Sequence, residues 1–373
     1  MRINLIIVCK FVAFSIKPVL VKNNRRRFIK SLVAGTTVTA LAPINIAWKD
    51  IEPTADIFKI LPKHLEKGDT LGLVSPGGFI TEEQLAETIK TVEKLGFKAY
   101  YRASVTAREG YFGGSDKVRA DDLMHMFTNK NVGGILCTRG GYGSNRILDL
   151  LDFEAIKQNP KVLIGYSDIT SLLVAIYQKT GLVGFHGPVG ISTFNEYSTK
   201  SFEKVLYKPK KRYKYAYERE KDSENNSDFD KYTISPGKAE GELIGGNLVL
   251  LRTLIGTEYE PDFENKIVFI EEIREKPYKI DRMLTHLLMA TNLAKAKGIV
   301  LGIFNKCDID TEDAGESFTL KEVLIERLST LNMPCFYGMP FGHVSNKITL
   351  PLGITAKMNA DKQSLILTEA AVY

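Results

Sequence analysis

From residue 67 onward, short apolar runs alternate along the chain with segments whose apolar residues recur at helical spacing. The run Thr70–Val74 predicts a buried strand. Thr81 with Gln84 forms a capping-box pattern at the start of a helix, and Gly96 ends that helix. The same alternation predicts further strands at 97–101, 133–138 and 161–165, with helices between them. Because parallel strands need crossover connections, we expect residues 60–207 to form a doubly wound, mainly parallel α/β domain.

The second half of the chain follows a less regular pattern. Strands are predicted at 267–270, at 298–304 and from 334 onward, with helices after 245–247, over 280–287 and from 319. This mixture predicts a second domain of the α+β class over residues 239–373. Residues 208–238 separate the two halves, and their many charged and tyrosine side chains predict an exposed linker.

Residues 1–47 differ from the rest of the chain in charge, because they carry eight Lys or Arg side chains and no Asp or Glu. Three consecutive arginines in Asn24–Lys30 precede a stretch of small and apolar residues over 31–42, and this pattern resembles a twin-arginine export signal. We therefore expect a periplasmic protein. A basic patch beside a short buried helix is the alternative for the structure. A retained membrane anchor is the alternative for the location, because residues 3–20 are largely apolar.

The net charge of the 373-residue chain is +6, from 50 basic and 44 acidic side chains. Without the eight basic residues of the leader, 42 basic side chains face 44 acidic ones, a balance of −2. The body of the chain therefore lacks the basic character of a nucleic-acid-binding protein. Three cysteines remain beyond the leader with no CxxC spacing, so we expect neither a disulfide framework nor a metal site.

Ser167 is the first candidate for chemistry, because it lies between a predicted strand that ends at Gly165 and a helix that starts near Ile169. A sharp turn there projects the hydroxyl toward a helix N-terminus, where backbone N–H groups favour developing negative charge. This geometry is typical of a serine nucleophile, although the usual G-x-S-x-G string is missing. The alternative is that Ser167 or Asp168 only caps the helix.

A serine nucleophile needs a general base, and the chain has five histidines. His186 and His343 are predicted to lie in Gly- and Pro-containing loops beside strands, where catalytic imidazoles are often held. The pattern alone does not choose between them. Glu271 and Glu272, at the end of the predicted strand 267–270, are candidates for the carboxylate that orients the imidazole. The alternative is that both acids only mark the exposed end of that strand.

Five motifs follow one another in order between residues 67 and 372. They are Arg139-Gly140-Gly141-Tyr142-Gly143, Gly165-Tyr166-Ser167-Asp168, Phe185-His186-Gly187-Pro188, Glu271 with Tyr278-Lys279-Ile280-Asp281-Arg282, and Pro340-Phe341-Gly342-His343 with Leu350-Pro351-Leu352-Gly353. Together they resemble the motifs of the LD-carboxypeptidases, a family of serine peptidases that also includes the microcin-immunity peptidases.

The resemblance implies a catalytic triad divided between the two domains. Ser167 corresponds to the nucleophile, His343 to the general base and acid, and Glu271 to the residue that orients the imidazole. The resemblance also implies an oxyanion hole formed by the amides of Gly141 and Asp168. Neither a metal nor a cofactor is implied.

The same resemblance implies a murein tetrapeptide as substrate, from which the terminal D-Ala is removed through an acyl-enzyme. It leaves His186 to shape the loop near the nucleophile. Two other functions stay open: a microcin-immunity-like peptidase that acts on peptidyl conjugates, and a catalytically silent protein that binds muropeptides in the periplasm. Many relatives are cytoplasmic, so export departs from the family pattern. Relatives are often dimeric, which makes a homodimer an open expectation.

Overall fold

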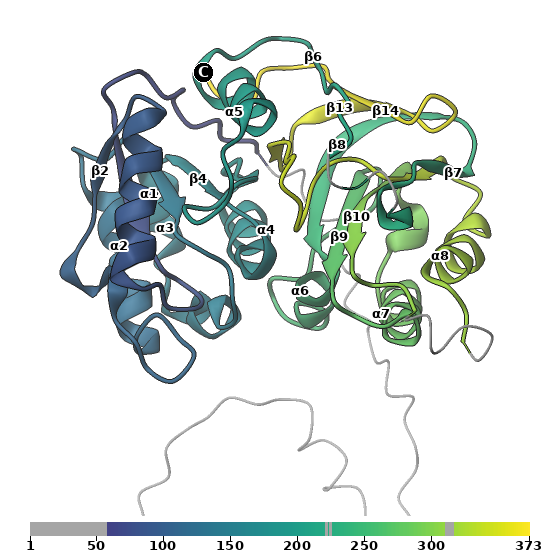
Figure 1. The fold of residues 1–373 in the computed structure, drawn as a ribbon, viewed down its shortest axis with the longest axis horizontal. Helices are drawn as coiled ribbons and strands as arrows, with labels where there is room; N and C mark the ends of the chain where they lie inside the picture. Colours follow the sequence, from purple (N-terminus) through teal and green to yellow (C-terminus); the bar gives the residue numbers. More distant parts are fainter. Residues whose placement is uncertain (1–57, 221–222, 224–225, 310–316) are drawn as a thin grey trace, which may run out of the picture. The chain divides into compact units, whose positions relative to one another are not determined.

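Two β-sheets organise the part of the chain that the structure describes (Figure 1). The computed structural model describes residues 58–220, 223, 226–309 and 317–373, and the predicted leader over residues 1–47 lies outside them. Within these ranges no helix has the length and apolar character needed to cross a membrane.

The first sheet has the strand order β12-β5-β4-β3-β1-β2. Its strands are β1 (Thr70–Val74), β2 (Lys98–Tyr100), β3 (Gly134–Cys137), β4 (Val162–Gly165), β5 (Phe185–His186) and β12 (Leu350–Pro351). All neighbours pair in parallel except β12, which runs antiparallel to β5 at one edge. The order reverses at β1, so right-handed crossovers place helices on both faces. The predicted doubly wound, mainly parallel sheet is confirmed.

The connections of this sheet contain five α-helices and three short 3₁₀ helices. The α-helices are α1 (Glu82–Lys94), α2 (Asp116–Thr128), α3 (Phe153–Gln158), α4 (Thr170–Thr180) and α5 (Glu196–Phe202), and the 3₁₀ helices are η1 (Ala103–Thr106), η2 (Ser144–Leu150) and η3 (Ser167–Ile169). The π-helical turn η4 (Glu203–Tyr207) extends α5.

The second sheet has the order β6-β14-β13-β8-β9-β10-β11-β7. Its strands are β6 (Tyr213–Lys214), β7 (Tyr232–Ser235), β8 (Lys238–Asn247), β9 (Ile267–Ile273), β10 (Gly298–Asn305), β11 (Cys335–Tyr337), β13 (Thr355–Asn359) and β14 (Ser364–Leu367), and its helices are α6 (Leu248–Thr253), α7 (Pro277–Ala290), α8 (Leu320–Ser329), η6 (Ser227–Phe229) and η7 (Leu293–Lys295). The four central strands are parallel and the outer ones antiparallel. This mixed sheet agrees with the predicted α+β class.

Several helices begin where the sequence predicts. Thr81 accepts a hydrogen bond from the amide of Gln84, whose side chain accepts one from the Thr81 amide in return, so the predicted capping box at α1 is confirmed. Thr319 with Glu322 forms a second capping box at α8, whereas Ser115 caps α2 with its side chain alone, which accepts from the amide of Val118. Each cap supplies an acceptor to an N–H group that lacks a partner within the helix.

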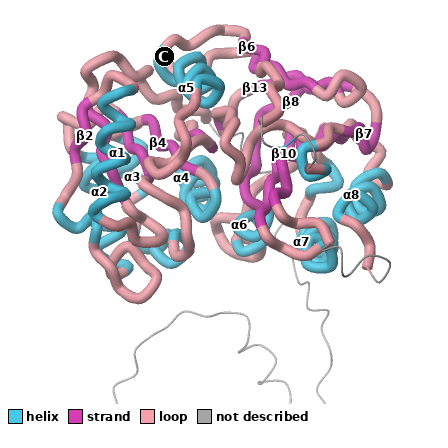
Figure 2. Tube along the Cα trace, viewed as in Figure 1, coloured by secondary structure: helices cyan, strands magenta, loops and turns pink. Residues whose placement is uncertain are grey.

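Residues 208–238 differ from the predicted exposed linker. They contribute β6 and β7, which form the two opposite edges of the second sheet, and Figure 2 shows β6 as a short strand within a run of loop. Tyr215 and Phe229 from this segment are buried. The two strands are only two and four residues long. Such short edge strands in charged sequence show no clear alternation, which explains why the pattern missed them.

Helix α4 begins three residues after Ser167 and packs against β8 and α6 of the second half (Figure 1). The amide of Asn247 donates a hydrogen bond to Thr170 Oγ1 at 3.0 Å. Gly246 has φ of 146°, and a Cβ atom there would lie 2.4 Å from Thr170 Cγ2. The missing side chain at Gly246 therefore allows the second sheet to approach the helix that follows Ser167.

We expect Gly246→Ala to destabilise the protein by about 3 kcal/mol, because a methyl group meets both an unfavourable φ and the side chain of Thr170. Gly256→Ala is the matched control, since Gly256 has φ of 77° with nothing within 4 Å. The control variant should lose only about 1 kcal/mol of stability, which is the cost of placing a non-glycine residue in a left-handed conformation. Urea unfolding measures both variants, and equal losses would show that the approach to Thr170 contributes nothing.

Candidate active site

Ser167 lies in a tight turn at the carboxyl end of β4, immediately before α4. Its φ is 64°, a left-handed conformation that costs a non-glycine residue about 1 to 2 kcal/mol. The neighbouring loop approaches closely, because a Cβ atom on Gly140 would lie 2.9 Å from Ser167 Cβ. The strained turn thus holds the hydroxyl at the end of the sheet, in the strand-turn-helix arrangement that the sequence predicts.

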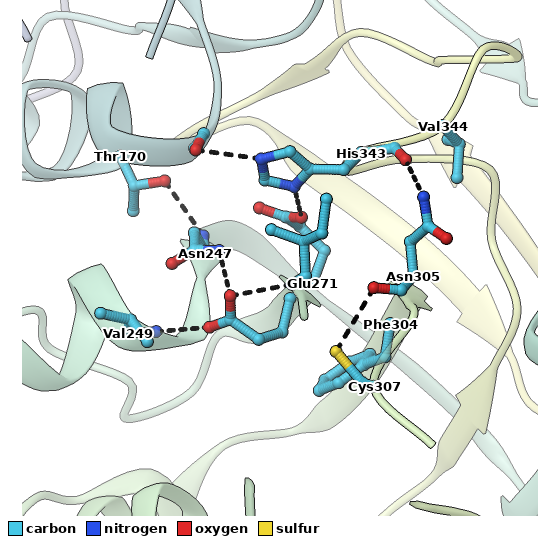
Figure 3. Close-up of polar contacts among 12 residues, drawn as sticks. Thr170, Asn247, Val249, Glu271, Phe304, Asn305, Cys307, His343 and Val344 are labelled. Carbon is cyan, nitrogen blue, oxygen red and sulfur yellow. Dashed lines mark hydrogen bonds and ion pairs between the residues drawn. The ribbon is translucent and has the colours of Figure 1, made fainter. Parts of the chain in front are cut away.

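Three side chains from both halves of the chain form a continuous hydrogen-bonded series. His343 Nε2 lies 3.0 Å from Ser167 Oγ. His343 Nδ1 lies 2.9 Å from Glu271 Oε2, and Figure 3 shows this contact together with the groups around it. Since the Glu271 carboxylate accepts a hydrogen bond from Nδ1–H, the imidazole carries its proton on Nδ1, and Nε2 is left free to accept the proton of the serine hydroxyl. The arrangement can transfer a proton from Ser167 to His343.

Glu271 is completely buried within β9, two residues before the strand ends at Ile273. Burial by itself raises the pKa of this carboxyl, but the charges and hydrogen bonds of His343, with smaller contributions from His186 and Asn247, outweigh it and hold the pKa below its usual value. The carboxylate is therefore ionised at neutral pH and accepts the hydrogen bond from His343 Nδ1 in its charged form.

Glu272 makes a different set of contacts. Its carboxylate accepts hydrogen bonds at 2.9 Å each from the Asn247 side chain and from the amides of Val249 and Ile273 (Figure 3). Burial, together with the charge of Glu271, raises the pKa of Glu272 to about 7. Adjacent residues on a strand point to opposite faces, so only one of the two acids reaches the imidazole. Neither marks an exposed strand end, because both are buried.

His186 lies in β5 rather than in a loop, which corrects the prediction for this residue. It is fully buried, and among the described residues neither of its ring nitrogens has a hydrogen-bond partner. Burial lowers the pKa of His186 to about 4, so the ring is neutral. It pairs with Gly165 in the sheet and its ring packs against Tyr166 and Phe269. His186 therefore supports the strand that leads into Ser167.

The two amides assigned to an oxyanion hole lie on neighbouring turns. Gly141 follows β3 with φ of 98°, and Asp168 is in the first turn of η3. The Asp168 carboxylate is buried and accepts a hydrogen bond from the Ser144 amide at 2.8 Å, which connects the turn at Ser167 to the loop that contains Gly141. Burial raises the pKa of Asp168.

Arg119 on α2 contacts the loop that contains Gly141, and the sequence pattern did not indicate this role. Its guanidinium is completely buried and donates hydrogen bonds to the carbonyl groups of Pro76 and Gly143, the latter at 2.9 Å. It also pairs with Asp116. The Arg119 side chain therefore connects the loop after β1 with the loop after β3.

The loop that carries His343 is held from several sides. Asn305, at the end of β10, donates its side-chain N–H to the His343 carbonyl at 2.7 Å (Figure 3). Glu220 Oε1 accepts hydrogen bonds from the amides of Ser345 and Asn346, the latter at 2.8 Å. Glu220 belongs to the segment that was predicted to be a linker, so the sequence offered no signal for this contact.

A pocket of about 270 Å³ opens beside His343. Tyr166, Ser192, Thr193 and Ser345 contribute to its wall. In the described part of the chain, no group of three or more His, Cys, Asp or Glu side chains is arranged to hold a metal ion. Cys137, Cys307 and Cys335 are buried and form no disulfide with one another.

Comparison with known protein families identifies the scaffold. The LD-carboxypeptidase N-terminal domain matches residues 71–187, and the LD-carboxypeptidase C-terminal domain matches residues 240–358. The chain belongs to the LD-carboxypeptidase family. The N-terminal match contains Ser167, and the C-terminal match contains Glu271 and His343. Glu220 lies between the two matched ranges.

Individual LD-carboxypeptidases and related structures agree with this assignment. A probable murein peptide carboxypeptidase of Bacillus subtilis is 36% identical over 316 residues, which cover 83% of this chain and 95% of that protein. The structure of MccF in complex with glutamyl sulfamoyl guanosine matches with a TM-score of 0.75 and 30% identity over 84% of this chain and 99% of that one. Muramoyltetrapeptide carboxypeptidase from Oxalobacter formigenes matches with a TM-score of 0.69 and 28% identity over 80% and 97%.

Removing the Glu220 carboxylate should loosen the His343 loop, because the amides of Ser345 and Asn346 lose their acceptor. Two amides left without a hydrogen-bond acceptor destabilise the closed loop by about 1 to 3 kcal/mol. In Glu220→Ala these amides should therefore exchange with solvent about 10- to 100-fold faster. Hydrogen exchange measures the change. Glu240→Ala removes an exposed carboxylate paired with Lys357 and should leave this loop unchanged. Equal exchange in Glu220→Ala and wild type would contradict the prediction.

Proposed function

We propose that this protein is a serine LD-carboxypeptidase that removes the terminal D-Ala from murein tetrapeptides. The observation that carries the proposal is the series Ser167–His343–Glu271, with contacts of 3.0 and 2.9 Å, in a chain of the LD-carboxypeptidase family. The name of the Bacillus subtilis relative supports a murein peptide as the substrate.

In the proposed mechanism, Ser167 Oγ attacks the carbonyl carbon of the bond before D-Ala while His343 Nε2 takes the hydroxyl proton. Glu271 stabilises the imidazolium that forms. The amides of Gly141 and Asp168 donate to the developing oxyanion. His343 then gives its proton to the leaving amine, D-Ala departs, and a water molecule activated by the same imidazole hydrolyses the acyl-enzyme.

A second candidate is a peptidase of the microcin-immunity kind that acts on peptidyl conjugates. The match to the structure of MccF in complex with glutamyl sulfamoyl guanosine supports this second candidate. Both candidates use the same triad, so the chemistry of the site does not separate them. The third candidate, a silent binding protein, requires that the serine and imidazole perform no reaction despite their contact.

The proposal predicts that the purified protein converts murein tetrapeptide to tripeptide with release of D-Ala, detected by mass spectrometry. Ser167→Ala removes the nucleophile and should lower kcat by about 10³- to 10⁶-fold. Because the hydroxyl contributes little to ground-state binding, the variant should still bind tetrapeptide. Cleavage of a peptidyl conjugate without any D-Ala release would favour the second candidate, and binding by wild type without turnover would favour the silent protein.

Two neighbouring acids provide the matched control for the triad. Glu271→Gln replaces the acceptor of the His343 proton by a neutral amide, which favours the wrong tautomer, and should lower kcat by about 10²- to 10⁴-fold. Glu272→Gln resembles the protonated form of an acid that does not contact the imidazole, and should keep activity within a few-fold. Equal losses in the two variants would remove Glu271 from the proposed triad.

We also propose that residues 1–47 direct export to the periplasm. The support is the run Arg25–Arg27 before a stretch of small and apolar residues. A reporter protein joined to residues 1–60 should reach the periplasm, and replacement of all three arginines by lysine should leave it in the cytoplasm because the receptor reads arginine rather than charge. Export that survives these replacements would contradict a twin-arginine signal.

A further inference from the structure

Lys347 is a buried lysine in the wall of the pocket beside His343. Only 3% of the residue is exposed. Its Nζ atom donates to the Val344 carbonyl at 2.9 Å and lies 4.0 Å from the centre of the Tyr166 ring. Among the described residues, no carboxylate oxygen lies within 4.0 Å of Nζ.

A buried ammonium group without an anionic partner is unfavourable, because water no longer solvates the charge. Burial accordingly lowers the pKa of Lys347 to about 8, against the opposing effects of Glu271 and Glu220. The carbonyl and the aromatic ring compensate only part of the lost solvation. An anion that entered the pocket would supply the missing partner.

The pocket lies where the leaving group is expected. His343 donates its proton to the departing amine, so the departing residue must lie on the imidazole side of Ser167. His343 itself and Tyr166, the residue before Ser167, line this pocket, whereas Ser167 and the amides of Gly141 and Asp168 lie outside its lining. The departing residue of a carboxypeptidase substrate carries a free carboxylate, and Lys347 is the only lysine or arginine among the described residues that line the pocket.

One acid in the same wall must be considered, because it would repel a carboxylate. Glu220 lines the pocket, but its Oε1 accepts the amides of Ser345 and Asn346, so part of its charge is compensated by the loop. Glu271 is fully buried and directed to His343. The hydroxyl-bearing side chains of the wall, such as Ser192 and Thr193, are compatible with a bound carboxylate.

We propose that the Lys347 ammonium group binds the C-terminal carboxylate of the departing D-amino acid and thereby restricts the enzyme to peptides with a free C-terminus. The inference rests on the proposed function and goes beyond it, because the triad itself requires no free carboxylate.

The test compares two substrates that differ only in this charge: the murein tetrapeptide acid and the same peptide ending in D-alaninamide. Wild type should cleave the acid at least 100-fold better in kcat/KM. Lys347→Met should reduce this preference to less than about 10-fold, mainly through the acid substrate, and Lys347→Arg should keep most of it because the positive charge remains.

Lys161→Met is the matched control. Lys161 is also a buried lysine, with 9% of the residue exposed, and its Nζ caps the carbonyl groups of Met126 and Asn129 at the end of α2, outside the pocket. Its pKa is likewise lowered to about 8 by burial. This variant should lose stability without changing the preference for the acid.

The pH dependence provides a second readout that needs no apolar variant. Around Lys347 the titratable groups are Glu220, Glu271, His343 and Tyr166, and burial raises the pKa of Tyr166 to about 12. Groups of the triad affect both substrates alike, so the ratio of their kcat/KM values isolates Lys347. The ratio should fall as pH rises through about 8, where the ammonium loses its proton, and Lys347→Arg should preserve it to higher pH.

The outcomes separate the inference from the proposed function. If wild type releases neither D-Ala nor D-alaninamide, the proposed function fails and the inference falls with it. If wild type cleaves both substrates equally, or if Lys347→Met lowers both equally, the carboxylate site is wrong while the peptidase stands. If Lys347→Met does not fold, a preference for the acid that does not change between pH 7 and 9 in wild type overturns the inference.

Discussion

The backbone pairing of β12 with β5 determines where the imidazole lies relative to the serine. β12 begins at Leu350, seven residues after His343, and Leu350 pairs with His186 of β5. In turn, His186 pairs with Gly165 at the end of β4, two residues before Ser167. The chain of the second half thus returns to the first sheet directly after the loop that carries His343. Backbone hydrogen bonds within the first sheet, together with the contacts of Asn305 and Glu220 to the loop, therefore hold the imidazole of His343 beside Ser167.

With that backbone in place, burial decides the charge of each group around Ser167. Glu271 is ionised because His343 compensates the cost of burying it, whereas Glu272, without an imidazole, has its pKa raised to about 7. His186 is kept neutral by the same burial. Electrostatic interactions are strong where water is excluded, so the charge of Glu271 acts on His343 with little screening.

Much of the fold follows from local signals. The apolar runs, the caps at Thr81, Ser115 and Thr319, and the turn at Ser167 all predict elements that the structure contains. The strand β8 was missed, because its glycines weaken the apolar pattern while permitting the close approach of Thr170. Its pairing, and that of the short β12, depends on partners far away in the sequence, which periodicity does not report.

In the candidate site, too, local signals were predictable from the sequence, whereas contacts between distant residues were not. The sequence pattern proposed Ser167 and two pairs of alternatives, and only the resemblance to the family favoured His343 over His186 and Glu271 over Glu272. Which residue of a strand faces the imidazole depends on the orientation of that strand in the sheet. The sequence pattern identified neither Glu220 nor Lys347. Their positions become informative only in the folded chain, where Glu220 contacts the His343 loop and Lys347 lies in the wall of the pocket.

The two sides of the site differ in origin, and this difference bears on substrate choice. Ser167, Glu271 and His343 lie in the two segments that match the family domains, so the chemistry rests on shared parts of the scaffold. Part of the wall of the pocket beside His343 comes instead from residues between those segments, among them Ser192, Thr193 and Glu220. Changes at Ser192 and Thr193 can alter the wall of the pocket without moving the triad, because the pairing of β12 with β5 does not involve them. Glu220 differs from these two, because it also holds the loop that carries His343. The proposed reaction can therefore be combined with different leaving groups on one backbone.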